Sequence, residues 1–361
     1  MRSKAKTHSE GKKLGYALGG GAARGLFHIG VLGVLEEYGV TPDIITGTSM
    51  GSIIGAMYAS GLRTSDLKHI ACSIDWKQMM RLADIVTLPK SGLIHGKRIV
   101  SLLKSILGDI NFSELKSKYA AVAADLYTGE QVVLTKGSLI EAIRASIAIP
   151  GILTPVHYDG RYLVDGGLVN VVPVSVCRDL GADFVIGVNA IPDPASGVMP
   201  VVISSAAGSD GDEGNGGIPD EEMRKPIIPG AHIQFHESRV SSINSAIHRF
   251  LLYRQPRTQK LIARKPSAVF SIRPKLVDTG KPNMFEILSQ SLSIIEYHIA
   301  MENLMTADIA ITPMEPTVGY WAFHRAAEVI AAGEKTTRLL LERDAVARMQ
   351  LTSLKSSYIT G

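Results

Sequence analysis

The hydrophobic pattern of this chain alternates between two kinds of segment. The short apolar run at 14–18 predicts a strand, and the apolar residues over 26–35 recur at helical spacing. A glycine-rich loop over 19–25 separates the two. The same order returns directly afterwards, where the apolar run at 43–46 leads to a helical stretch at 52–58. The beginning of the chain therefore predicts two strand–loop–helix units in succession.

Later segments continue this pattern. The pattern between 64 and 108 predicts mostly helix, and the periodic apolar residues of 284–306 predict a long, mostly buried helix. Asp159 and Gly160 are a tight-turn signal between two short strands at 156–158 and 161–164. The remaining predictions are strands at 119–125, 131–135, 184–189 and 308–312, and helices at 138–146, 173–180, 320–332 and 335–349.

Changes in composition predict how the chain is divided. Residues 206–230 are rich in Gly, Asp, Glu and Pro and lack periodicity, whereas 238–277 contains nine Lys or Arg residues and no Asp or Glu. We therefore place boundaries near 190 and 280. The predicted parts are a basic tail (1–13), a core (14–190), an insertion with a flexible linker and a basic amphipathic segment (191–280), a part that completes the core domain (281–350) and a polar tail (351–361).

The composition narrows the class of protein and its compartment. With 361 residues, of which 45% are apolar and 20% charged, the chain can bury a large core. Its two cysteines cannot form a disulfide framework, and no Cys/His cluster has the spacing of metal ligands. No apolar run approaches the roughly 18 residues of a membrane span, and 1–13 lacks the apolar part of a secretion signal. We expect a cytoplasmic protein, with peripheral contact to the inner membrane face as an option, and no metal or cofactor.

The loop over 19–25 places bare backbone N–H groups before a helix, where negative charge is stabilised. A P-loop would need Gly-Lys-Ser/Thr at the end of this loop, and Arg24-Gly25-Leu26 does not supply it. A dinucleotide fingerprint started at Gly19 would put Arg24 at its third glycine, and it lacks the later acidic residue. The oxyanion that forms when a serine attacks an ester needs preorganised N–H donors near the nucleophile, and it fits this loop best.

The stretch 47–51, Gly-Thr-Ser-Met-Gly, supplies such a serine. G-x-S-x-G between a strand and a helix predicts a nucleophile elbow, a sharp turn that lifts the serine hydroxyl clear of the sheet at the positive end of the following helix. Ser49 is the candidate nucleophile. Gly47 and Gly51 allow the backbone to turn.

A third motif follows the predicted hairpin. Its second strand runs into Asp165-Gly166-Gly167, so a carboxylate at a strand end is followed by two residues without side chains. Such a carboxylate can be held against another loop without crowding, or it can cap a turn. The sequence pattern is compatible with both roles.

The stretches 20–25, 47–51 and 165–167, in this order and in these contexts, resemble the patatin-like phospholipases. Residues 145–150 and 164–170, with Pro173 after them, are similar to the bacterial branch of that family. The resemblance covers 14–190, and more loosely the segment around 323–326. It implies a three-layer α/β/α fold with a central, mostly parallel sheet.

The resemblance also implies a serine hydrolase of lipid esters, of phospholipase A or lysophospholipase type, that uses a Ser-Asp dyad without histidine. Ser49 would be the nucleophile and Asp165 the base, which needs burial to raise the pKa of about 3.9 of a solvated Asp. Ala22 departs from the family's usual third glycine. The implied roles are oxyanion hole for Gly20, Gly21 and Ala22 and loop positioning for Arg24 and Gly25. Gly47 and Gly51 would be the glycines of the elbow, and Gly166 and Gly167 the motif glycines after the base.

Two alternatives stay open. In an α/β-hydrolase triad the chain order is Ser, Asp, His, and His324 lies late enough to be the third member. In a non-catalytic lipid-binding protein the basic amphipathic segment 239–257 would contact an anionic membrane surface. No recognised nucleic-acid-binding motif accompanies this segment, and we expect no nucleic-acid partner.

Overall fold

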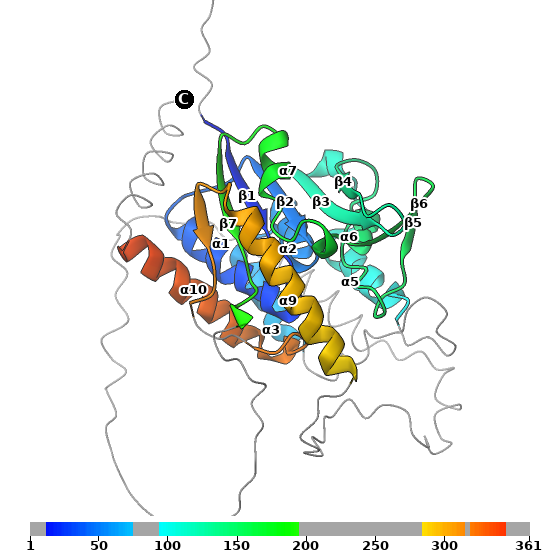
Figure 1. Ribbon diagram of the computed structural model, residues 1–361. Coiled ribbons are helices and arrows are strands. Elements are labelled where there is room, and N and C mark those ends of the chain that lie inside the picture. Colours follow the sequence, from blue (N-terminus) through cyan, green and yellow to red (C-terminus); the bar gives the residue numbers. More distant parts are fainter. Residues whose placement is uncertain (1–11, 75–93, 195–283, 315–317, 344–361) are drawn as a thin grey trace, which may run out of the picture.

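The computed structural model describes residues 12–74, 94–194, 284–314 and 318–343, and these ranges form one sheet with helices packed on it (Figure 1). The sheet has eight strands. Their bounds are β1 (Leu14–Leu18), β2 (Ile44–Thr48), β3 (Lys118–Asp125), β4 (Gln131–Leu134), β5 (Val156–Tyr158), β6 (Arg161–Asp165), β7 (Phe184–Val188) and β8 (Ile309–Ile311).

The centre of the sheet is parallel. β1 pairs in parallel with β2 and β7, β2 with β3, and β7 with β8. β4 and β6 pair antiparallel with β3, and β5 and β6 form the predicted hairpin around Asp159 and Gly160. All five residues of β1, β2 and β7 are buried, as in strands that are covered on both faces.

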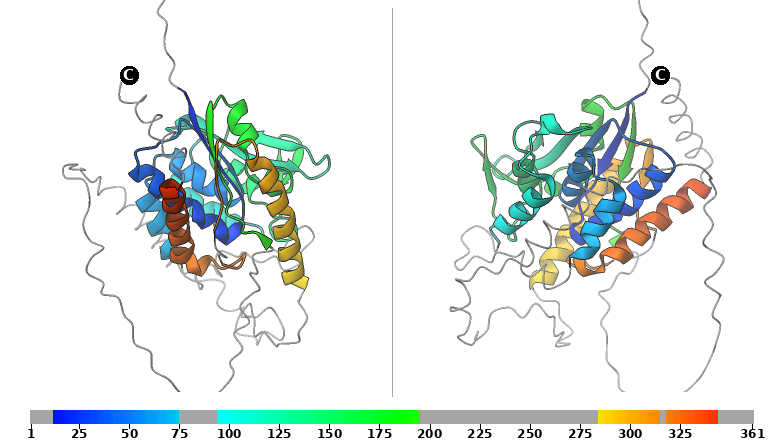
Figure 2. Two further views of the ribbon diagram at one scale, coloured as in Figure 1. Left: turned by 60° about the vertical axis from the view of Figure 1, so that its left-hand side comes forward. Right: turned by 180° about the vertical axis from the view of Figure 1, so that it is seen from behind.

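Helices cover both faces of the sheet (Figure 2). The first layer contains α1 (Phe27–Glu37), α2 (Met50–Ala59), α3 (Thr64–Ser73) and α10 (Ala326–Arg343), and the second contains α7 (Val174–Asp179) and α9 (Met284–Leu304). Side chains alternate along β1, where Tyr16 joins the larger core and Ala17 the smaller one. α5 (Lys97–Leu107) packs on α6 (Leu139–Ser146), which contacts β3 and β6. The predicted fold, a mostly parallel central sheet between helical layers, is confirmed.

β3 brings distant parts of the chain together. It is longer than β2, and Thr48 at the end of β2 pairs with Val122. The next residue, Ala123, pairs with Asp165 at the end of β6. β4 occupies the opposite edge of β3 at both positions, so β2 and β6 lie on the same edge. The residues that follow β2 therefore meet the end of β6.

The C-terminal helices differ from the prediction in two ways. α9 is not mostly buried, because it turns Ser293 and Glu296 toward the sheet and exposes apolar side chains, among them Ile287, Ile294 and Ile295. The two helices predicted at 320–332 and 335–349 correspond to a 3₁₀ turn and α10, which runs through Gly333 without a break. Gly333 serves close packing, since a Cβ there would lie 2.2 Å from the Phe27 carbonyl oxygen of α1.

Several predictions fall on residues outside the described ranges. They include the linker 206–230, the basic segment 239–257 and both terminal tails. The division of the chain into parts therefore stays a prediction, although β8, α9 and α10 of the C-terminal part pack on the same sheet as the rest. Within the described ranges, no helix is long and apolar enough to cross a membrane.

Candidate active site

Ser49 lies between β2 and α2 in a backbone conformation that is unusual for a residue with a side chain. Its φ is 53° and its ψ is −122°. Hydrogen bonds on both sides hold this conformation: the Ser49 N–H donates to Ser146 Oγ (3.0 Å), and Ser52 Oγ donates to the Ser49 carbonyl (2.7 Å). Ser146 is itself fixed, because its Oγ donates to the Val122 carbonyl at 2.6 Å. The predicted elbow is thus a strained turn supported by α2, α6 and β3.

The elbow glycines permit close backbone contacts. A Cβ at Gly47 would lie 2.4 Å from the Gly51 carbonyl oxygen, and a Cβ at Gly51 would lie 2.1 Å from the Leu18 carbonyl oxygen. The Gly51 N–H donates to the Gly19 carbonyl at 3.1 Å. A Cβ at Gly25 would lie 2.5 Å from Met50 Cβ. These contacts bring the glycine loop directly against the start of α2.

Ser49 and Asp165 form a direct, buried pair. Ser49 Oγ donates to Asp165 Oδ2 at 2.7 Å, and each residue is 3% exposed. Asp165 Oδ1 accepts the Gly167 N–H at 2.8 Å, so both carboxylate oxygens have a donor. A Cβ at Gly166 would lie 2.3 Å from the Val122 carbonyl oxygen, which places the turn after Asp165 tightly on β3. Burial raises the pKa of Asp165 to about 6, and the hydrogen bonds from Gly167 and Ser49 oppose this increase.

The glycine loop offers two N–H groups near this pair. The N–H groups of Gly21 and Ala22 have no hydrogen-bond partner among the described residues. Gly20 differs from the prediction for the oxyanion hole, because its N–H already donates to the Val171 carbonyl at 3.1 Å. Ala22, at the position where a third glycine was expected, has a left-handed φ of 48°. The loop can therefore direct Gly21 and Ala22 toward an anion.

Arg24 connects the glycine loop to the C-terminal part of the chain. It is 6% exposed, its Nε donates to the Val318 carbonyl (3.0 Å) and its Nη1 donates to Ser293 Oγ of α9 (2.6 Å). The guanidinium also lies over the Tyr320 ring, 5.6 Å from its centre, and the Ala23 N–H donates to the Tyr320 carbonyl. These contacts are suited to the positioning role expected for Arg24.

Sequence reasoning missed His28 as a support of the same loop. His28 is fully buried, and its Nε2 lies 2.7 Å from the Gly19 carbonyl oxygen. Burial lowers the pKa of His28 to about 4, so the ring is neutral and Nε2 carries the proton that it donates to this carbonyl. The position of His28 in the apolar stripe of α1 was the available signal, since a polar residue there needs a buried partner.

Glu296 and Tyr320 were also missed. Glu296 is 6% exposed on α9, and Tyr320 OH donates to its Oε1 at 3.2 Å. The spacing of Ser293 and Glu296, three residues apart, was the available signal, because it puts two polar side chains on one helical face. Only the packing of α9 shows that this face points to the glycine loop and Asp165.

The structure does not bring His324 to the serine. His324 is exposed in the 3₁₀ turn Phe323–Arg325, whereas Ser49 and Asp165 are buried and bond directly to each other. No histidine in the described part of the chain bonds to either of them. The geometry therefore favours a two-residue arrangement over the triad.

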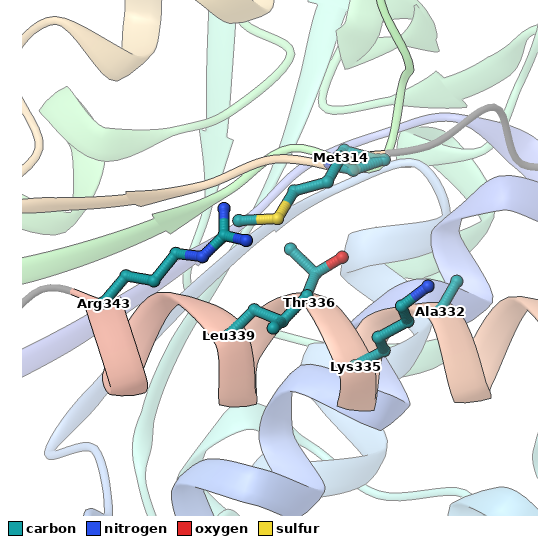
Figure 3. A pocket seen from close by; sticks show the side chains of 7 residues that line it. Met314, Ala332, Lys335, Thr336, Leu339 and Arg343 are labelled. Carbon is teal, nitrogen blue, oxygen red and sulfur yellow. The ribbon is translucent and has the colours of Figure 1, made fainter.

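A hollow elsewhere on the surface shares no residue with this site. Met314, which follows β8, lines this hollow together with Lys335, Leu339 and Arg343 of α10 (Figure 3). The hollow contains none of the predicted site residues.

Comparisons with known proteins show which family and which proteins this chain is similar to. A family model described as Patatin-like phospholipase matches residues 16–178, a range that contains all three motifs. An uncharacterized NTE family protein of Mycobacterium tuberculosis is 31% identical over 355 residues, covering 92% of each chain. Patatin-like phospholipase domain-containing protein 6 of Mus musculus is 36% identical over 185 residues, which are 50% of this chain and 14% of that protein. The crystal structure of VipD from Legionella pneumophila matches with a TM-score of 0.42 and 14% identity, covering 51% of this chain and 52% of VipD.

Proposed function

This chain belongs to the patatin-like phospholipase family, and we propose that it hydrolyses carboxylic esters of lipids with a Ser49–Asp165 dyad. The observation that carries this proposal is the buried hydrogen bond of 2.7 Å from Ser49 Oγ to Asp165 Oδ2 at the strained elbow. A phospholipid or lysophospholipid is the substrate class that we infer, with a free fatty acid as one product. The family membership supports lipid hydrolysis, and the dyad is our assignment.

The reaction proceeds in two halves. In the first, Ser49 Oγ attacks the ester carbonyl carbon while its proton moves to Asp165 Oδ2, and the alcohol leaves with that proton as the acyl-enzyme forms. In the second, Asp165 accepts a proton from water, the resulting hydroxide attacks the acyl carbon, and Ser49 recovers its proton as the fatty acid leaves. Asp165 is well placed for both steps because it contacts Ser49 directly.

The glycine loop stabilises the negative charge that develops on the carbonyl oxygen. We assign the donor role to the N–H groups of Gly21 and Ala22, which have no partner among the described residues. Gly20, which we expected to contribute as well, instead anchors the loop through Val171. Arg24 and His28 keep the loop in place from two sides, at Ser293 and Gly19.

The buried position of Asp165 meets the requirement that we set for a carboxylate base. With a pKa of about 6, Asp165 is ionised at pH 7 and binds a proton more strongly than a solvated carboxylate. Hydrolysis is therefore expected to rise with pH through about 6, where Asp165 loses its proton.

The test compares two serine variants on α2 and its preceding turn. Purified wild type, Ser49→Ala and Ser60→Ala are assayed with a short-chain chromogenic ester and a lysophospholipid, and the same samples are treated with a fluorophosphonate probe. The Ser60 hydroxyl donates to the Met57 carbonyl at the other end of α2, so Ser60→Ala controls for the loss of a hydroxyl group next to the same helix. We expect wild type and Ser60→Ala to turn over and be labelled, and Ser49→Ala to do neither. Equal labelling of Ser49→Ala would contradict the proposal.

A further inference from the structure

A second carboxyl group faces the turn that follows the base. A Cβ built on Gly167 would lie 3.0 Å from Glu296 Oε1 and 3.2 Å from Asp165 Oδ1. Glu296 Oε1 of α9 and Asp165 Oδ1 of β6 therefore both lie next to the position of this Cβ, on the same side of Gly167. Both side chains are buried, with Glu296 6% and Asp165 3% exposed.

Glu296 is poorly supplied with hydrogen-bond donors. Tyr320 OH donates to Oε1 at 3.2 Å, and Oε2 has no partner among the described residues. Three titratable groups face Glu296 from the elements around it, namely Asp165 of β6, Tyr320 of the segment after β8, and Arg24 of the glycine loop. The Arg24 guanidinium donates hydrogen bonds to the Val318 carbonyl and to Ser293 Oγ, and not to Glu296. A charged carboxylate at this position would thus be largely unpaired.

The surroundings therefore favour the neutral form of Glu296. Burial first, and the charge of Asp165 second, raise the pKa of Glu296 to about 8, while the hydrogen bond from Tyr320 and the charge of Arg24 oppose the increase. At pH 7 Asp165 is mostly ionised and Glu296 mostly protonated. The two carboxyl groups can then lie side by side without repulsion.

The turn that follows Asp165 packs closely on β3 and on Glu296 of α9. On one side Gly166 touches β3, since a Cβ there would lie 2.3 Å from the Val122 carbonyl oxygen. On the other side Glu296 fills the space next to Gly167. The Gly167 N–H in turn holds Asp165 Oδ1 at 2.8 Å. Displacement of Glu296 is therefore transmitted through Gly167 to the carboxylate that contacts Ser49.

We propose that Glu296 is a positioning residue, which keeps the Ser49–Asp165 pair in its reactive geometry only while Glu296 is a neutral carboxylic acid. This inference rests on the proposed function. When Glu296 loses its proton, the carboxylates of Glu296 and Asp165 both lie next to Gly167 and repel each other. The turn that carries Asp165 then moves relative to Ser49. The enzyme therefore loses activity at alkaline pH through a group that does not touch the reacting atoms.

The test is the pH dependence of kcat and KM between pH 5 and 10 for wild type, Glu296→Gln and Glu302→Gln. Glutamine keeps the shape of Glu296 and cannot ionise, and Glu302 is an exposed glutamate of the same helix. For wild type and Glu302→Gln we expect kcat to rise through about pH 6 and to fall above about pH 8, to about a tenth of its plateau at pH 9, with KM changed less than kcat. Glu296→Gln should keep the rise and lose the fall.

A second variant moves the alkaline limb without replacing Glu296. Tyr320→Phe removes the hydrogen bond that stabilises the ionised Glu296 and leaves the ring beneath Arg24. The fall should then begin at higher pH than in wild type. Two outcomes would overturn the inference while leaving Ser49-dependent hydrolysis intact. In the first, kcat of Glu296→Gln falls at alkaline pH as it does in wild type. In the second, the fall of kcat in Tyr320→Phe does not move to higher pH. If the wild type shows no Ser49-dependent hydrolysis, the proposed function fails and this inference with it.

Discussion

The carboxyl groups of Asp165 and Glu296 both lie next to Gly167, yet their surroundings favour opposite charge states. Asp165 ends a strand and receives a donor on each oxygen, from Ser49 and from Gly167. Glu296 projects from a helix, receives one longer bond from Tyr320 and leaves Oε2 without a partner in the described part of the chain. Burial raises the pKa of both, to about 6 and about 8. Burial is the largest cause of both increases, but two donors oppose it at Asp165, whereas the charge of Asp165 adds to it at Glu296.

This difference also separates the base that we propose, Asp165, from the positioning residue that we propose, Glu296. A base must be ionised when substrate arrives and must touch the proton that it accepts, and Asp165 meets both conditions. A neutral acid beside it adds shape without adding negative charge, so Asp165 keeps the pKa that its own hydrogen bonds allow. Substitutions of Asp165, of Glu296 and of Gly167, which both carboxyl groups contact, test this difference.

The largest effect is expected for Asp165→Asn. The single carbonyl oxygen of asparagine can keep the Gly167 hydrogen bond while its NH2 group lies next to Ser49 Oγ, but asparagine cannot take the proton, so hydrolysis of the chromogenic ester should fall by about 10²–10⁴-fold. Labelling by the fluorophosphonate should fall in parallel. Glu296→Gln, the same chemical change next to Gly167, is the matched control, and it should retain activity at pH 7. Near wild-type turnover of Asp165→Asn would remove the dyad.

Asp165→Asn should not cost stability at neutral pH. The folded-state pKa of Asp165 lies above the ordinary value of 3.8, so its contribution to stability is present below that value and is lost as pH rises through about 6. The asparagine variant lacks this loss. Its melting temperature at pH 7 should therefore equal or exceed that of the wild type, which separates lost chemistry from lost folding.

A smaller effect is expected for Gly167→Ala, which acts on the contact between the two carboxyl groups. The new methyl group would press on Glu296 Oε1 and Asp165 Oδ1, at 3.0 and 3.2 Å, and both must move by a few tenths of an ångström. We expect kcat to fall about tenfold, because small displacements of a catalytic group are costly. Gly33→Ala in α1 is the control, since a Cβ there meets nothing closer than Thr64 Oγ1 at 3.9 Å. Equal kcat values in the two variants would show that the Gly167 contact does not constrain Asp165.

The positions of Ser49 and Asp165 in the fold were predictable from the sequence. Ser49 and Asp165 each lie at the end of a short apolar run, next to glycines, and such motifs determine local backbone geometry within a few residues. Their contact depends on the register of β3, which no local pattern encodes, but the order of the motifs and the family resemblance supplied that contact. The left-handed backbone at Ala22 could not be predicted, because alanine does not favour it.

The supporting side could not be predicted, for a physical reason. In a sequence the apolar residues of 284–306 predict the buried face of a helix, whereas α9 exposes Ile287, Ile294 and Ile295 and buries Ser293 and Glu296. Polar residues turn inward here because Arg24 and Tyr320, far away in the sequence, offer them partners. Periodicity describes one helix at a time and contains no information about such partners.

The pH dependence of stability is the third way to test the comparison. The folded-state pKa of Glu296 lies above the ordinary value of 4.5, so its contribution to stability is full below that value and is lost as pH rises through about 8. Wild type should lose stability relative to Glu296→Gln across this window, by about 1.4 kcal/mol for each pH unit at most. Urea unfolding at half-unit intervals measures the difference. Parallel curves for the two proteins would mean that Glu296 titrates like a solvated glutamate.

The smallest effect is expected for Ala22→Gly in the glycine loop. Arg24 connects this loop to α9, the helix that carries Glu296. A left-handed alanine costs about 1–2 kcal/mol, and glycine removes this cost. Two effects oppose this gain in stability. Glycine has greater freedom in the unfolded chain, which costs about 0.4–1 kcal/mol, and a buried methyl group is lost, which costs about 0.8 kcal/mol. The free energy of unfolding should therefore change by less than about 1 kcal/mol in either direction.

Asp159→Gly provides the control for this prediction. Asp159 has the same left-handed φ of 48° in the β5–β6 hairpin, but its side chain is exposed, so no buried methyl group is lost there. Asp adopts a left-handed backbone more readily than Ala, so Asp159→Gly relieves a smaller backbone cost and loses no buried methyl group. A decrease in stability that is confined to Ala22→Gly therefore reports the packing of the Ala22 methyl group. A loss of more than about 2 kcal/mol in Ala22→Gly alone would mean that the methyl group, held among the core residues, is what fixes the loop whose N–H groups we assign to the oxyanion.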